Sequence, residues 1–275
     1  MSLDAQRAAT PLDTRPGASA RAGTGAPAGP AVQISAVSKS FGRGDTALLA
    51  LDQVSLSVAP GEFVCLIGAS GCGKSTLLNL VAGLDAPTSG EIATGGRRVA
   101  LMFQESALFP WLTAARNVAV PLQAAGVPRA QRRERVAELL DLVQLSGFAD
   151  KRPHELSGGM RQRVALARAL AQDADVLLMD EPFGALDAMT RDLLHEVLEG
   201  IWRRRHLSIV FVTHEVREAV RLGDRVVLLS SRPGRVIGEF DVDFDRPRGM
   251  DSPDTVGLAI KIKDRLREEI VRHGR

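Results

Sequence analysis

The stretch Gly68-Ala69-Ser70-Gly71-Cys72-Gly73-Lys74-Ser75-Thr76 decides the fold. An apolar run from Glu62 to Ile67 precedes it, and leucines at helical spacing follow it as far as Ala82. A strand, a glycine-rich loop and a helix in this order, with the spacing G-x-x-x-x-G-K-S, are typical of a phosphate-binding loop. The glycines let the backbone curl so that several N–H groups face one phosphate chain, and the helix presents its positive end to the same anion.

The side chains of this loop fit a nucleotide with magnesium better than a glycine-rich turn formed by chance. Lys74 can reach the β- and γ-phosphates of a nucleoside triphosphate, and the Ser75 hydroxyl can ligate Mg²⁺. Cys72 lies inside the loop, where its thiol is either reactive near the nucleotide or simply small enough to fit. The sequence leaves both readings of Cys72 open.

Composition and charge narrow the class of protein. The chain has 275 residues, 45% hydrophobic and 25% charged, which suits one or two globular domains. A net charge of +2 gives no reason to expect nucleic acid or an anionic membrane surface as a partner. The sequence has no apolar run near the roughly 20 residues that cross a bilayer. Because Cys65 and Cys72 span a strand-to-loop junction, we expect no disulfide and a reducing cytoplasm.

The region before the loop predicts a tail and an antiparallel sheet. Residues 1–30 are rich in Ala, Gly and Pro without periodicity, so we expect a disordered tail. Alternating apolar residues between Val32 and Val58 predict antiparallel strands. Phe41 lies in this region and is either a core or edge aromatic or a ring that stacks on a nucleotide base.

Polar side chains follow three further predicted strands at the point where each strand ends. Gln104 follows an apolar run ending at Phe103, Asp180 and Glu181 follow a second run, and His214 follows a third. Ligands of α/β proteins bind at the carboxyl ends of strands, so we expect these groups near the γ-phosphate. Asp180 suits a Mg²⁺ ligand, and Glu181 suits a base or a group that positions water. A solvated acidic turn and a structural histidine are the alternatives.

The other half of the chain is largely helical. Residues 113–172 read as helices, and Leu156-Ser157-Gly158-Gly159-Met160 opens one of them, as a second anion site or as a plain cap. Asp187 by itself is a helix cap. Phe109-Pro110-Trp111-Leu112 is either core or an apolar docking surface. Residues 253–273 predict an amphipathic helix.

In this order, the motifs resemble the nucleotide-binding subunit of ATP-binding cassette (ABC) transporters over roughly residues 31–240. Residues 68–76 match the Walker A loop, Val176–Glu181 Walker B and Gln104 the Q-loop. The signature is matched by residues 156–160, with Met160 where Gln is usual, and the A-loop aromatic by Phe41, where Tyr is commoner. The D-loop and the switch histidine are matched by Asp187 and His214.

The resemblance implies an α/β P-loop fold. It has a mixed RecA-like core sheet, a small antiparallel β subdomain and an α-helical signature subdomain. We expect an ATPase domain at residues 31–248, with the helical subdomain inserted at about 105–172, and a helical extension at 249–275. Residues 109–113, 180–187 and 229–235 look like the nitrate, sulfonate and taurine importers. Residues 151–168 and 245–248 look most like aliphatic sulfonate importers.

The resemblance also implies a mechanism and partners. ATP and Mg²⁺ would bind at Phe41, residues 68–76, Gln104, Asp180 and Asp187, with Ser75, Gln104 and Asp180 near the metal. Two cassettes would dimerise head to tail, so that Ser157, Gly158 and Gly159 of one cover the γ-phosphate held by Lys74 of the other. Glu181 would polarise water, His214 would hold the γ-phosphate and Gln104 would sense Mg²⁺ and the membrane partner.

The expected partners are two permease subunits and a periplasmic or lipid-anchored binding protein, with the chain at the cytoplasmic face of the membrane. The alternatives are nitrate or taurine import, a soluble cassette protein acting on DNA or ribosomes, and a non-catalytic nucleotide-binding regulator.

Overall fold

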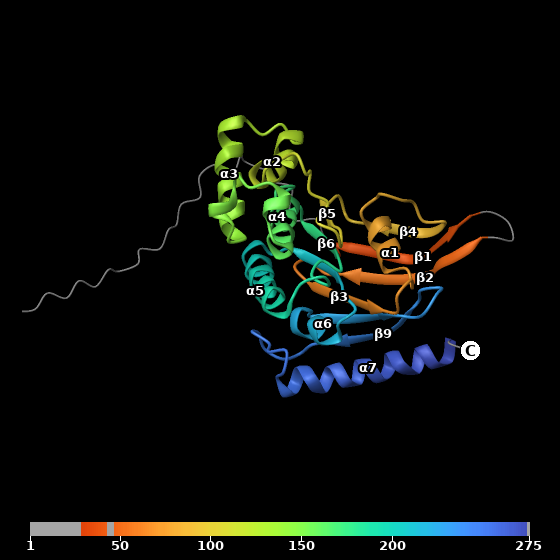
Figure 1. Ribbon diagram of the computed structural model, residues 1–275. Helices are drawn as coiled ribbons and strands as arrows, with labels where there is room; N and C mark the ends of the chain where they lie inside the picture. Colours follow the sequence, from red (N-terminus) through yellow and green to blue (C-terminus); the bar gives the residue numbers. More distant parts are fainter. Residues whose placement is uncertain (1–28, 43–46, 274–275) are drawn as a thin grey trace, which may run out of the picture.

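The computed structural model describes residues 29–42 and 47–273, shown in colour in Figure 1. Almost all of the predicted N-terminal tail, residues 1–28, lies outside the described residues. The described part is an α/β fold with a mixed sheet, an antiparallel sheet and surrounding helices, as the sequence predicted.

A six-stranded sheet forms the centre of the molecule, in the order β5-β6-β7-β3-β8-β9. Neighbouring strands from β5 to β8 run parallel, and β9 pairs with β8 antiparallel. The strands are β3 (Phe63–Gly68), β5 (Val99–Met102), β6 (Val176–Asp180), β7 (Ser208–Val212), β8 (Arg225–Leu229) and β9 (Val236–Asp241). The carboxyl ends of the five parallel strands therefore meet at one edge of the sheet.

A second, three-stranded sheet has the order β2-β1-β4 and is antiparallel. Its strands are β1 (Val32–Phe41), β2 (Leu48–Val58) and β4 (Ser89–Ala93), which confirms the strands predicted between Val32 and Val58. Helix α1 (Lys74–Val81) contacts β2 and β4 of this sheet and β3 and β6 of the central sheet (Figure 1). The phosphate loop before α1 thus lies where the two sheets approach each other.

The remaining helices cover the other face and the end of the central sheet. They are α2 (Ala114–Ala124), α3 (Arg129–Leu142), α4 (Gly158–Leu170), α5 (Ala188–Arg205), α6 (Val216–Leu222) and α7 (Pro253–His273), with short 3₁₀ turns at Ser146–Phe148 and Pro153–Glu155. Helices α2, α3 and α4 pack on one another and stand away from the antiparallel sheet (Figure 1). The amphipathic helix predicted at residues 253–273 is confirmed as α7.

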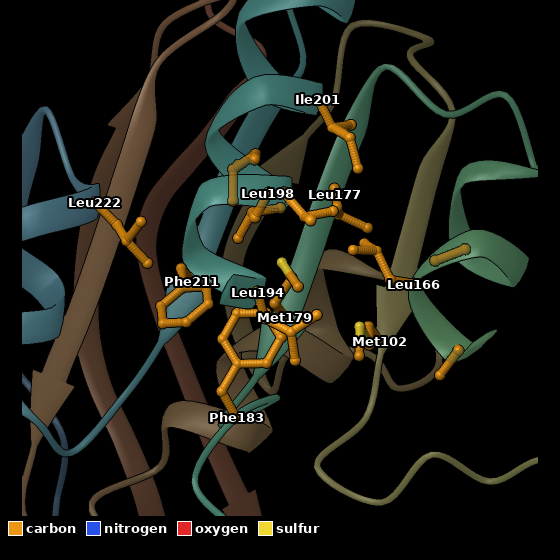
Figure 2. Close-up of a cluster of buried hydrophobic side chains, with 14 of the residues drawn as sticks. Met102, Leu166, Leu177, Met179, Phe183, Leu194, Leu198, Ile201, Phe211 and Leu222 are labelled. Atoms are coloured by element: carbon orange, nitrogen blue, oxygen red, sulfur yellow. The ribbon is translucent and has the colours of Figure 1, made fainter. Parts of the chain in front are cut away.

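Alternate residues of the central strands point into two separate cores. Cys65 and Ile67 of β3 join the core beneath the helices, whereas Val64 and Leu66 join the core shared with α1 and the antiparallel sheet. Figure 2 shows part of the first core, where Phe183 meets Met179 of β6, Phe211 of β7 and Leu194 of α5. A strand buried on both faces reads as a continuous apolar run, which explains the sequence pattern at residues 176–179.

Two arginines anchor the segment that leads to α7. Arg248 is buried and donates to the carbonyl oxygens of Phe244, Val220, Gly223 and Val242. Arg246 donates to Leu222 O and Asp224, and its guanidinium lies 4.5 Å from the centre of the Trp202 ring. These arginines belong to the stretch at residues 245–248 that resembles sulfonate importers, and their observed contacts hold this segment on α6 and its neighbours.

Candidate nucleotide site

The phosphate loop connects β3 to α1 in a tight curl. Gly73 has φ of +102°, and a Cβ atom there would lie 2.6 Å from Leu51 Cδ2. The Lys74 ammonium is nearly buried and donates to Gly68 O at 2.9 Å and Ala69 O at 3.1 Å. It thus lies against the loop backbone, within reach of a phosphate chain bound to the N–H groups of this loop.

The Cys72 side chain packs inside the phosphate loop, beside Gly68. Its side chain is buried, and burial raises the pKa of the Cys72 thiol, although nearby Lys74 opposes that shift. Because a thiol must ionise to react, the geometry favours the reading in which Cys72 is a small residue that fits. Cys65 and Cys72 are both free thiols, as the sequence predicted.

Ser75 and Asp180 place a hydroxyl and a carboxylate beside Lys74. The Ser75 hydroxyl donates to the Asp180 carboxylate. Burial raises the pKa of Asp180, the Glu181 charge adds to the shift, and the Ser75 hydrogen bond opposes it. In the part of the chain that the structure describes, no group of three or more His, Cys, Asp and Glu side chains could hold a metal. A hydroxyl and one carboxylate fit Mg²⁺ that also binds phosphate oxygens and water.

Glu181 and His214 meet at the ends of two adjacent strands. Glu181 follows β6, and its backbone N–H donates to Val212 O of β7 at 3.0 Å. Its Oε2 lies 3.1 Å from His214 Nδ1, and the His214 ring is exposed. The backbone of Glu181 has φ of +43°, in the left-handed region that residues other than glycine adopt uncommonly. The structure therefore brings the predicted base and the predicted γ-phosphate ligand together.

A buried network supports the strand end that carries His214. Thr213 donates to Glu218, whose other carboxylate oxygen lies 2.7 Å from His195 Nε2. The Thr213 hydroxyl also accepts from the N–H of Glu215 at 3.0 Å. His195 comes from α5 and Glu218 from α6. This network was not predicted from the sequence, because His195 and Glu218 look like ordinary helix residues until the fold brings α5 and α6 together.

Gln104 lies just beyond β5 and touches the helix of the signature motif. Its backbone oxygen accepts from Gln162 Nε2 of α4 at 2.7 Å, and its side chain is exposed. The predicted Mg²⁺ contact of Gln104 remains a prediction. The position does connect the edge of the central sheet to the helical region.

The predicted second anion site begins α4. The Ser157 hydroxyl caps this helix by accepting from Met160 N at 3.2 Å, and α4 begins at Gly158. A Cβ atom on Gly159 would lie 2.2 Å from Thr190 Cγ2, and Asp187 accepts from Thr190 N at 3.0 Å. Gly158 and Gly159 therefore pack against the residues on either side of Asp187 in the same chain.

Phe41 and Trp111 both lie at the surface, which excludes the alternative that either is a core residue. Phe41 is 43% exposed, and Lys39 Nζ lies 5.1 Å from its ring centre. Trp111 is 67% exposed, with its ring 5.6 Å from that of Phe109. Buried Asn117 shapes this turn, since its side chain accepts from Phe109 N and donates to Leu112 O. The role of Asn117 was invisible in the sequence.

Comparisons with known proteins match this geometry. The model of the family "ABC transporter" matches residues 51–184. A taurine import ATP-binding protein of Rhizobium johnstonii is 50% identical over 72% of this chain and 78% of its own length. The chain belongs to the ABC transporter ATP-binding proteins. Similar relatives include a nitrate import ATP-binding protein of Synechocystis (48% identical; 72% of this chain and 77% of the relative) and an aliphatic sulfonates import ATP-binding protein of Bacillus licheniformis (45% identical; 78% and 86%).

A solved ABC structure supports the activity. It is the dimer of the ATP-binding cassette MJ0796 in a post-hydrolysis state, bound to ADP and Pi. It is 34% identical to this chain, with a TM-score of 0.70 over 78% of this chain and all of that chain. The present chain, as a member of this family, therefore binds and hydrolyses ATP. Among the described helices of this chain, none is long and apolar enough to cross a membrane.

Proposed function

We propose that this ABC ATPase supplies the energy for importing a small anion, with aliphatic sulfonates as the first candidate. The observation that carries the proposal is the agreement among relatives of similar identity, which are named as taurine, nitrate and aliphatic sulfonates import proteins. Taurine is itself a sulfonate, so two of these three names share one anionic group. Nitrate import is the alternative.

Hydrolysis at this site would rest on positioning and charge rather than on a covalent intermediate. Lys74 and the loop N–H groups bind the β- and γ-phosphates, while the Phe41 ring stacks on the base. Mg²⁺ held by Ser75 and Asp180, with Gln104 nearby, would offset the charge of the phosphate chain.

Glu181 and His214, whose side chains lie 3.1 Å apart, would activate and position the attacking water molecule. Glu181 accepts a proton from water as the water oxygen attacks the γ-phosphorus. The bond from the γ-phosphorus to the β–γ bridging oxygen then breaks. The products are ADP and phosphate. His214 contacts Glu181 through Nδ1, and its Nε2 would bind the γ-phosphate.

A second copy of the chain completes the site. The Ser157 cap and the α4 N-terminus carry free N–H groups of a helix start, which favour an anion. Because the similar solved cassettes are dimers, we infer that the γ-phosphate these groups would cover is that of the partner cassette. ATP would then hold a head-to-tail dimer together until hydrolysis releases it.

We place the chain at the cytoplasmic face of the membrane, bound to two permease subunits that receive substrate from a periplasmic or lipid-anchored binding protein. The exposed Phe109 and Trp111 rings provide the docking surface for those subunits, because interface energy concentrates in large aromatic side chains. We also propose an ATPase domain at residues 31–248, with a helical subdomain inserted at about 105–172, and a helical extension at 249–275.

The decisive assay measures ATP turnover of the transporter assembled in proteoliposomes with its membrane subunits and binding protein. An alkanesulfonate or taurine is expected to raise turnover, and nitrate is not. Stimulation by nitrate alone would establish the alternative substrate. Failure of the chain to associate with any membrane subunit would overturn import and favour a soluble cassette function.

A further inference from the structure

The hairpin between β8 and β9 packs directly on the phosphate loop. Arg232 donates from both Nε and Nη2 to the carbonyl oxygen of Gly71, at 3.1 and 3.0 Å. Two residues further on, a Cβ atom on Gly234 would lie 2.2 Å from the Cys72 oxygen. Only glycine allows so close an approach. The hairpin therefore touches two successive carbonyl groups on the outer side of the loop.

The hairpin is itself held in place from the opposite side. Gly234 N donates to Ala50 O at 2.9 Å, and Asp52 N donates to Gly234 O at 3.0 Å. Arg235 forms an ion pair with the Asp52 carboxylate. Ser230 Oγ closes the turn by accepting from Arg235 N at 2.9 Å. Arg232 thus extends toward the loop from a base tied to β2, the strand whose Leu51 packs against Gly73.

This contact has a direct consequence for the shape of the loop. The Gly71 carbonyl and the Cys72 N–H belong to one peptide group, so a guanidinium on the oxygen strengthens the hydrogen bond that this N–H donates to Ala69 O at 3.2 Å inside the loop. Gly71 has φ of +75°, and its oxygen points away from the inside of the curl toward Arg232. A charge-assisted bond with two donors fixes this conformation more firmly than a neutral hydrogen bond would.

We propose that Arg232 is a positioning residue that holds the phosphate loop in the shape that receives the nucleotide and so sets the affinity for ATP. The inference rests on the proposed nucleotide-binding role of residues 68–76. Because Arg232 acts on the loop and not on the water or the γ-phosphorus, it stabilises the ground state and the transition state equally. Its removal therefore raises KM and leaves kcat nearly unchanged.

The test is equilibrium titration of the full chain with a fluorescent ATP analogue, together with steady-state ATP hydrolysis. Arg232→Ala is expected to weaken binding and raise KM by about fivefold, the upper size of one lost charge-assisted contact at an exposed site. Arg232→Lys is expected to recover part of the affinity, because a single ammonium reproduces the charge but not the fork.

Arg235→Ala is the matched control, because it removes an arginine from the same hairpin that pairs with Asp52 and not with the loop. Its affinity is expected to stay within about twofold of the unaltered chain, as for an exposed ion pair. Equal losses in Arg232→Ala and Arg235→Ala would overturn the inference, since they would point to hairpin stability alone. Unchanged affinity in Arg232→Ala would overturn it too, while leaving the proposed function intact. No nucleotide binding by the unaltered chain would overturn both.

Discussion

Glu181 Oε2 lies 3.1 Å from His214 Nδ1, although the two residues are 33 positions apart in the sequence. The contact exists because β6 and β7 are parallel neighbours, with Asp180 opposite Val212. The residues that follow these two strands therefore emerge side by side. This pair, next to the loop that ends β3, forms the centre of the proposed hydrolytic site.

Replacing either member of this pair should slow hydrolysis while keeping the nucleotide. Glu181→Gln keeps the size of the side chain but cannot accept a proton, so kcat is expected to fall at least about 100-fold, as for loss of a general base. His214→Ala should also lower kcat sharply. Phosphate release, measured beside the affinity for a fluorescent ATP analogue, checks both variants. Hydrolysis at the normal rate in Glu181→Gln would refute the assignment.

Lys74→Ala should abolish useful ATP binding. The Lys74 ammonium is nearly buried inside the loop, at 2.9 Å from Gly68 O, and it is the cation placed to neutralise the phosphate chain. Equilibrium titration is expected to show affinity weakened by at least about 100-fold, as for a charge-assisted contact made at several oxygens. Near-normal affinity together with full turnover would contradict the role given to Lys74.

Trp111→Ala should impair assembly and leave the isolated subunit folded. Because Trp111 is 67% exposed, its removal is expected to change the melting temperature and the basal ATPase little. Co-purification with the membrane subunits, and uptake, should be lost. Phe63→Ala is a matched control, since that ring is fully buried and its loss should destabilise the fold by about 3–5 kcal/mol. Normal co-purification of Trp111→Ala would rule out the docking role.

Arg248→Lys should destabilise the protein even though it conserves the charge. Burial lowers the pKa of Arg248 to about 10, with the nearby Arg246 charge acting in the same direction, so the guanidinium is still charged at neutral pH. Its nitrogens donate to four backbone carbonyl groups, and a lysine cannot reach all of them. The loss should be at least about 2 kcal/mol, since buried acceptors are left unpaired.

Chemical denaturation measures this change in the free energy of unfolding. Arg267→Ala provides a control on α7, because that side chain is exposed and pairs only with Asp264 at 3.5 Å among the interactions in the described chain. Its effect should stay below about 0.5 kcal/mol. Equal stability of Arg248→Lys and the unaltered chain would show that the buried fork does not anchor this segment.

The sequence could predict the phosphate loop and the polar strand ends because each is a local pattern. Glu62–Thr76 contains its own strand, turn and helix start, and parallel strands place their carboxyl ends on one edge. The exposure of Phe41 and Trp111 depends on what packs against them, so the local sequence left it open. The contacts of Arg232 with Gly71 and of Glu218 with His195 depend on register between distant elements, which no local pattern contains.

The measurement that tests the composite site most directly is the mass of Glu181→Gln in solution, by size-exclusion chromatography with light scattering. This variant should hold ATP without hydrolysing it, so Ser157–Gly159 of one chain can stay on the γ-phosphate bound by the other. We expect a dimer with ATP and a monomer without nucleotide. A monomer in both conditions, with ATP shown to be bound, would contradict a site completed by a second chain.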